Sequence, residues 1–179
     1  MLGFRVGSLT LALFQHSRML SHRTVLPCRN LVAIVGDTCD IHLHDMSSKR
    51  AVQALHGHLD WSFAVSWHPN GNLLATGNQD CTARLWDVRN PRQSLDVLPS
   101  TMGAVRSCRF SPDGLSLAVS EPADFVHLYD LSSGCAKGQE IDFFGEISGI
   151  SFEPSSSLLF IGIPDRMYNS VLCYQKPNS

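Results

Sequence analysis

The feature that most constrains this chain is an internal repeat with a period of about 42 residues. An aromatic residue two positions before a proline occurs at Trp67, Phe110 and Phe152, so that the spacings are 43 and 42 residues. A second marker, an aromatic ring or imidazole followed by Asp or Gln, keeps the same period at positions 44–45, 86–87, 129–130 and 174–175. Two independent markers with one period predict copies of a single structural unit over residues 20–179.

Each unit is predicted to consist of short strands. In the second unit, strand-like runs alternate with turn signals such as His68-Pro69-Asn70-Gly71, where the glycine is free to take a positive φ. The expected strands of the second and third units are residues 62–67, 73–77, 82–87, 94–98, 105–110, 117–120, 125–130 and 140–144. The prediction is an all-β fold, a partial propeller of about four four-stranded antiparallel blades with units near 20–56, 57–99, 100–144 and 145–179.

The run GHLDWSFAVSWHPNGNLLATGNQDCTARLWD, residues 57–87, resembles one unit of the WD-repeat (WD40, transducin β-like) β-propeller family. The likeness extends over residues 20–179, and the chain is similar to the C-terminal portion of less-studied WD-repeat proteins of the cytoplasm or nucleus without assigned chemistry. The resemblance implies a structural tetrad of hydrogen-bonded side chains at His58, Thr76, Asp80 and Trp86. It also implies a non-catalytic scaffold that binds other proteins through the loops at one rim of the propeller.

The chemistry of the four tetrad side chains suits a buried relay. An indole N–H only donates, a threonine hydroxyl donates and accepts, an imidazole does both, and a carboxylate accepts. Only the second unit has the full set. In the third unit Val119 and Ala123 occupy the Thr and Asp places, Asp124 comes one position late, and Tyr129 occupies the Trp place. The other units are therefore expected to depend on apolar packing and strand pairing.

The sequence favours no catalytic site, cofactor or metal ion. It has no nucleophile elbow and no phosphate-binding glycine loop. The pairs His42-x-His44 and His56-x-His58 place two imidazoles on one face of a strand, as a metal site would, but His44 and His58 already have structural places. Six cysteines without a C-x-x-C spacing are expected to be reduced and buried, with disulfides or a zinc site as the less favoured alternatives. An enzymatic or ligand-binding propeller is the less favoured alternative.

Partner binding is expected on the loops, because strands supply rigidity and loops supply variety. The loops before each unit's first strand and after its second strand share one rim in this family. The candidate partner-binding residues on them are Trp61, Asn78, Gln79, Glu121, Glu146, Asp165, Arg166 and Tyr168. Trp, Tyr and Arg are the usual anchors of interfaces, and the acids favour a basic peptide. A net charge of −2 without blocks of like charge argues against nucleic acid or a membrane as partner.

Residues 1–19 are a divergent N-terminal segment, expected to be disordered or targeting-like. Arginines occur at positions 5, 18, 23 and 29, whereas the first acidic residue is Asp37. Organelle targeting is therefore an alternative to a cytoplasmic or nuclear location. No apolar run reaches the roughly 18 residues of a membrane span.

The number of units is small for a closed ring, since six to eight such blades need roughly 250–340 residues. The expectation is an open arc that is a fragment of a longer propeller. The alternatives are an arc that dimerises or completes another chain, a four-bladed ring, and a truncated gene product without independent activity. Because an open arc exposes strand edges, self-association through the blade edges is also expected.

The tetrad assignment predicts unequal effects of two aspartate substitutions. Asp80→Ala should destabilise the chain by about 1–3 kcal/mol, because it leaves buried donors without an acceptor. Asp124→Ala, one place away from the equivalent position in the third unit, should cost much less. Thermal unfolding of the two variants measures the difference, and equal shifts would contradict the assignment.

Overall fold

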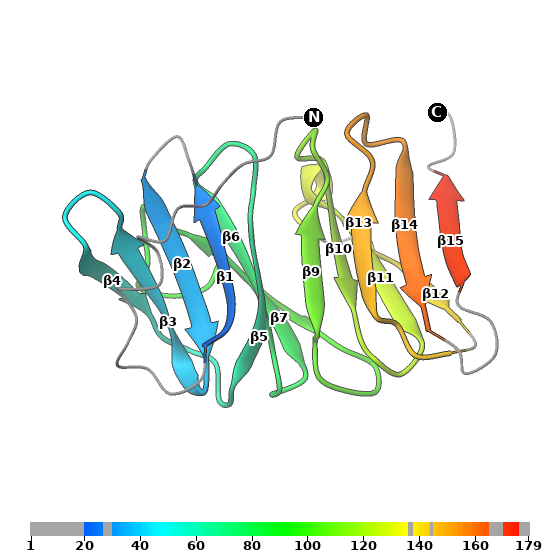
Figure 1. Ribbon diagram of the computed structural model, residues 1–179, viewed down its shortest axis with the longest axis horizontal. Helices are drawn as coiled ribbons and strands as arrows, with labels where there is room; N and C mark the ends of the chain where they lie inside the picture. The colour runs from blue at the N-terminus through cyan, green and yellow to red at the C-terminus, as the bar shows by residue number, and fades with distance from the viewer. Residues whose placement is uncertain (1–19, 27–29, 136–137, 144, 165–169, 176–179) are drawn as a thin grey trace.

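The structure, a computed structural model, describes residues 20–26, 30–135, 138–143, 145–164 and 170–175. Within these ranges the chain is all-β, with one 3-10 turn and no helix long and apolar enough to cross a membrane. Figure 1 shows four antiparallel sheets that stand side by side, in chain order, along an open arc. The predicted all-β partial propeller is thereby confirmed.

Each sheet is a meander of consecutive strands. The first contains β1 (Leu20–Leu26), β2 (Leu31–Gly36), β3 (Thr38–Asp45) and β4 (Arg50–Leu55). The second contains β5 (Ser62–Trp67), β6 (Leu73–Asn78), β7 (Thr82–Asp87) and β8 (Asp96–Pro99). The third contains β9 (Ser107–Phe110), β10 (Ser116–Ser120), β11 (Phe125–Asp130) and β12 (Gly138–Asp142). The fourth has three strands within the described residues, β13 (Gly149–Phe152), β14 (Leu158–Ile163) and β15 (Ser170–Gln175).

The turns between first and second strands follow from their sequence. Gly71 and Gly114 adopt φ values of 73° and 74°, and each donates its amide back to the residue three positions earlier, at 2.9 Å. Only glycine takes this left-handed conformation without strain. The same turns join neighbouring sheets, since His68 Nε2 lies 2.9 Å from the Gly114 carbonyl oxygen.

The apolar core lies between the sheets. The innermost strands β1, β5, β9 and β13 contact one another in that order. Three clusters of buried side chains fill the three successive interfaces. At the first interface, Trp86 is fully buried with Ile41 and Leu43 of the first sheet. Each sheet therefore depends on its neighbour for the burial of its apolar face.

Three predicted strands have ends that are displaced by two residues. The structure has β8 at Asp96–Pro99, β9 at Ser107–Phe110 and β12 at Gly138–Asp142. The expected strand 105–110 starts late because the Val105 amide donates to the Asn78 carbonyl of the neighbouring sheet, at 3.0 Å, instead of entering its own ladder.

The prediction that the cysteines are buried is wrong for three of them. Cys39, Cys81 and Cys173 are exposed, whereas Cys108 and Cys135 are buried, and all five are free thiols. Burial raises the pKa of Cys108 to about 12, so this thiol stays protonated in the core. Position 28 lies outside the described residues.

Gly77 sets the closest approach of the second and third sheets. A Cβ atom at this position of β6 would lie 2.9 Å from the Val105 carbonyl oxygen and would overlap the Val105 side chain, which is fully buried. By contrast, a Cβ atom at Gly149 of β13 would meet nothing within 4 Å. The two glycines therefore differ in what a methyl group would displace.

Gly77→Ala should lower the free energy of unfolding by about 1–3 kcal/mol, because the added methyl group overpacks a rigid interface. Gly149→Ala is the matched control and should be neutral or slightly stabilising. Chemical denaturation of both variants measures the difference. A Gly77→Ala variant as stable as Gly149→Ala would contradict this account of the interface.

Candidate protein-binding rim

Loops from neighbouring units meet at one end of the strands, and we call residues 56–61, 79–81, 100–106, 121–124 and 145–148 the rim loops. Backbone hydrogen bonds join them. The Gln79 amide donates to the Trp61 carbonyl at 2.8 Å, and the Ser100 amide donates to the Cys81 carbonyl at 2.9 Å. The Ile147 amide donates to the Pro122 carbonyl at 3.2 Å. The loops are thus held to one another and to the sheets beneath them.

The four residues of the expected tetrad lie in series beneath the first of these loops. Trp86 Nε1 donates to Thr76 Oγ1 at 2.9 Å. Thr76 Oγ1 lies 2.8 Å from His58 Nε2, and His58 Nδ1 lies 2.8 Å from Asp80 Oδ2. The His58, Thr76 and Trp86 side chains are buried, so the chain of hydrogen bonds runs from the core to the rim.

The direction of this relay follows from the charge of its last member. An ionised carboxylate only accepts, so His58 Nδ1 must donate to Asp80, and Nε2 then accepts from the Thr76 hydroxyl. Burial lowers the pKa of His58 more than the neighbouring Asp80 raises it, which keeps the imidazole neutral. Thr76 is fully buried, and its hydroxyl donates its hydrogen bond to His58. The buried Thr76 hydroxyl suits the structural role that the resemblance implies for these four residues.

Asp80 connects the relay to the exposed loop above it. Its carboxylate accepts from the Leu59 amide at 3.0 Å, and from the Thr82 amide and hydroxyl at 3.0 and 2.6 Å. Burial by itself would raise the pKa of Asp80, but the hydrogen bonds from Thr82, His58 and Leu59 together lower it. The ionised form of Asp80 therefore fixes the loop that begins at Leu59.

A second buried carboxylate, that of Glu121, fixes the rim loop before the first strand of the third unit. Its Oε1 accepts from the Thr101 amide at 2.6 Å, and its Oε2 accepts from the Met102 and Gly103 amides at 2.7 and 2.8 Å. His127 Nε2 lies 2.6 Å from Oε1. Burial would raise the pKa of Glu121, but these donors together lower it.

This anchor corrects two expectations. The third unit does not depend on apolar packing and strand pairing alone, because Glu121 takes the place that neither Ala123 nor Asp124 fills. Glu121 itself is fully buried, so it holds a loop and does not face a partner. The available sequence signal was an acidic residue directly after β10 with a histidine on β11, the strand that pairs with it. The spacing of the repeat had instead indicated position 123 or 124 for the acidic residue.

The other candidate partner-binding residues divide into exposed, buried and undescribed positions. Trp61 is 52% exposed, and Gln79 and Glu146 are exposed as well. Asn78 is fully buried, because its amide donates to the Asp60 carbonyl at 2.6 Å and to Ser62 Oγ at 2.8 Å, so its proposed contact with a partner does not hold. Asp165, Arg166 and Tyr168 lie outside the described residues.

Sequence reasoning left two exposed apolar residues of the rim loops out of the candidate set. Leu59 is 81% exposed and Met102 is 71% exposed. Both belong to loops that end at the first strand of a unit, and both have amides bound by a buried carboxylate, Asp80 or Glu121. The sequence places both residues on rim segments, but only Trp, Tyr, Arg and polar residues of those segments were chosen as candidates.

The histidine pairs do not gather metal ligands. His56 and His58 follow β4 and lie in a rim loop, which corrects their placement on a strand face. His56 Nδ1 meets Asp40 Oδ1 at 2.8 Å in an exposed pair, while His58 belongs to the relay. Among the residues the structure describes, no group of three or more His, Cys, Asp or Glu side chains could hold a metal ion.

The blades and their relay define a propeller-type repeat protein, and comparisons with known proteins identify the repeat. The family model "WD domain, G-beta repeat" matches residues 49–87. The matched segment starts just before β4 and ends with β7, so it contains the outer strand of the first sheet and three strands of the second. The match shows that residues 49–87 are a repeat of the WD type.

Curated relatives agree with this family. The chain is 33% identical over 84 residues to the Periodic tryptophan protein 2 homolog of Neurospora crassa, which covers 47% of this chain and 9% of that protein. It is 24% identical over 111 residues to the Target of rapamycin complex subunit LST8 of Mus musculus, 61% of this chain and 34% of the relative. It is 29% identical over 101 residues to the Guanine nucleotide-binding protein subunit beta of Arabidopsis thaliana, and this match covers 52% of this chain and 26% of the relative. The chain thus spans about a third or less of the length of these relatives.

Glu121→Gln should lower the free energy of unfolding at neutral pH by about 1–3 kcal/mol, because an amide cannot accept from all the backbone donors that the carboxylate satisfies. Glu146→Gln, on an exposed rim position, is the matched control and should stay within about 0.5 kcal/mol. Urea denaturation at pH 7 measures both changes. A loss as small as that of the control would contradict the anchoring role of Glu121.

The loss of stability in Glu121→Gln, relative to the wild-type chain, should depend on pH. Because the pKa of Glu121 is lowered in the folded chain, its contribution is complete above the unfolded value of about 4.3 and is lost as the pH falls below that value. The stability difference between the wild-type chain and Glu121→Gln should therefore shrink between pH 5 and pH 3. The contribution of Asp80 is common to both proteins and cancels in this comparison.

Proposed function

We propose that this chain is a non-catalytic scaffold that binds a protein partner through its rim loops. The observation that carries the proposal is the exposure of Leu59, Trp61 and Met102 on loops whose backbones are fixed from below by Asp80 and Glu121. Apolar side chains held in place lose little freedom on binding, which favours association.

Trp61 is the strongest single candidate for an anchor. Its amide donates to Asp60 Oδ1 at 2.7 Å and its carbonyl accepts from the Gln79 amide at 2.8 Å, so the indole projects from a fixed backbone. Tryptophan is among the residue types that contribute most to protein interfaces. Two of the similar proteins are named as subunits, one of the target of rapamycin complex and one of a guanine nucleotide-binding protein.

The polar surroundings of the rim suggest the chemistry of the partner. Gln79 and Glu146 are exposed on rim loops, and the Arg106 guanidinium is stacked 3.8 Å above the centre of the Phe63 ring. A partner that combines an apolar side chain with basic groups for Glu146 fits this surface best. We propose the cytoplasm or nucleus as the place of action, in line with the WD-repeat proteins that the sequence resembles.

Site-specific photo-crosslinking tests the proposal in the full chain. A photoreactive amino acid at the exposed rim position 79 should capture a defined partner, and Trp61→Ala or Met102→Ala in the same chain should reduce recovery of that partner at least tenfold. Leu95→Ala is the matched control, since Leu95 is 56% exposed but precedes β8 at the opposite end of the strands. Equal loss with all three variants, or capture from position 95 alone, would contradict a rim site.

A further inference from the structure

The fourth sheet presents an open edge at β15. Within the described residues, β15 pairs with β14 on one side only, whereas each of the first three sheets has a fourth strand. Figure 1 shows β15 at the end of the row of sheets, and residues 170–173 and 175 are exposed. An edge strand of this kind offers a row of backbone N–H and C=O groups with which another strand can pair.

The outer strands of the other three sheets have features that discourage such pairing. β4 begins with Arg50, and β8 is four residues long and ends with Pro99. β12 contains Glu140 and Asp142. Charged side chains, proline and short length are devices that protect sheet edges. β15 has six residues, SVLCYQ, with no charge and no proline, so its edge is unprotected.

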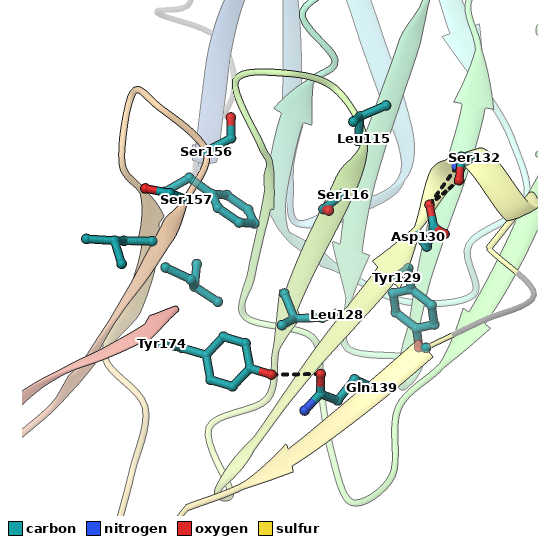
Figure 2. Close-up of a pocket in the computed structure, with 14 residues that line it drawn as sticks. Leu115, Ser116, Leu128, Tyr129, Asp130, Ser132, Gln139, Ser156, Ser157 and Tyr174 are labelled. Atoms are coloured by element: carbon teal, nitrogen blue, oxygen red, sulfur yellow. Dashed lines mark hydrogen bonds between the residues drawn. The ribbon is translucent and has the colours of Figure 1, made fainter. Parts of the chain in front are cut away.

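The position of β15 is fixed by its contacts with the third sheet. The Tyr174 hydroxyl donates to Gln139 Oε1 of β12 at 2.8 Å, and Figure 2 shows this bond from one sheet to the other. A groove of about 480 Å³ lies between the two sheets, and both residues line it. The Tyr174 side chain also packs against the apolar cluster between these sheets. An edge that is already fixed loses little freedom when another strand binds.

Apolar side chains of β15 are exposed on both faces of the sheet. Leu172 pairs with Ile161 and is 40% exposed on the face towards the third sheet. Val171 is 70% exposed on the opposite face, and Cys173 is exposed there as well. A strand added to this edge would cover part of each of these side chains, which favours its binding.

We propose that two copies of this chain associate by antiparallel pairing of their β15 strands, with three strands from each copy in one continuous sheet. A two-fold axis makes the same strand both partners, and a strand without charged residues meets no like charge in its copy. One strand pair buries less than the roughly 1,200 Å² of stable interfaces, so the dimer should be weak and dependent on concentration. This edge is separate from the rim loops, and neither proposal requires the other.

The two-fold axis also sets the register of the pair. Directly opposed residues of an antiparallel pair project from the same face, so the axis must pass through a residue and not between two residues. An axis at Cys173 places Leu172 of each copy opposite Tyr174 of the other. An axis at Leu172 would place Tyr174 opposite Ser170, which covers less apolar surface of the ring. We therefore assign the axis to Cys173.

Sedimentation velocity with the full chain over a dilution series tests the pairing. The wild-type chain and Cys173→Ser should both convert from monomer to dimer as the concentration rises. Cys173→Lys places two ammonium groups opposite each other and should weaken the dimer about fivefold. Val52→Lys is the matched control on an exposed position of β4, and it should dimerise like the wild-type chain, as should Trp61→Ala. A chain that is monomeric at every concentration, or that forms only larger aggregates, would overturn the proposal.

Two further measurements test the register and the edge. An equimolar mixture of Cys173→Lys and Cys173→Glu should regain the dimer, because opposite charges then face each other, and a mixture no better than either variant alone would overturn the register. A short bismaleimide should link Cys173 to Cys173, which is possible only between copies, whereas the exposed Cys39 and Cys81 should not link to their own counterparts. Hydrogen exchange of the β15 amides should slow as the concentration rises. Protection of these amides that is equal at every dilution would mean that the edge is covered within one chain, and would overturn the proposal.

Discussion

Contact between neighbouring sheets is the constraint on which the rest of this structure depends. A sheet of four short strands has no interior of its own, and its apolar side chains leave water only when another sheet covers them. Here the fully buried Trp86, together with Ile41 and Leu43, fills the first such interface, and the closeness of Gly77 to Val105 sets the second. The rim loops and the groove both exist because these contacts fix one sheet against the next.

The chain uses two chemical solutions for the same local problem. A loop that enters a blade from its neighbour has backbone amides that strand pairing cannot satisfy, and a buried carboxylate can accept several of them at once. In the second unit Asp80 does this with the support of His58, Thr76 and Trp86. In the third unit Glu121 does it with one histidine, His127, and three consecutive amides. The longer glutamate side chain reaches the loop from a position closer to the preceding strand.

Much of the fold could be predicted, because the repeated sequence pattern indicates where strands and turns alternate. The strands β5, β7 and β11 coincide with the predicted ranges, since their alternation and flanking turns are local properties. Strand ends such as that of β9 could not be predicted, because Val105 bonds to a different sheet. The role of Glu121, in place of Asp124, and the burial of Asn78 could not be predicted either. Both depend on hydrogen bonds between residues that are distant in the sequence. The groove of about 480 Å³ between the third and fourth sheets could not be predicted either, because its lining combines residues that are distant in the sequence.

The offset between sequence repeat and sheet has a consequence for how such a chain can be divided or extended. The matched repeat, residues 49–87, supplies β4 to one sheet and β5, β6 and β7 to the next. The matched repeat therefore links two blades covalently, and its boundaries do not coincide with those of a sheet. Duplication of a repeat would insert a complete blade without leaving an unpaired edge at the junction. A cut at the same boundary would instead take the outermost strand from a sheet that is otherwise intact.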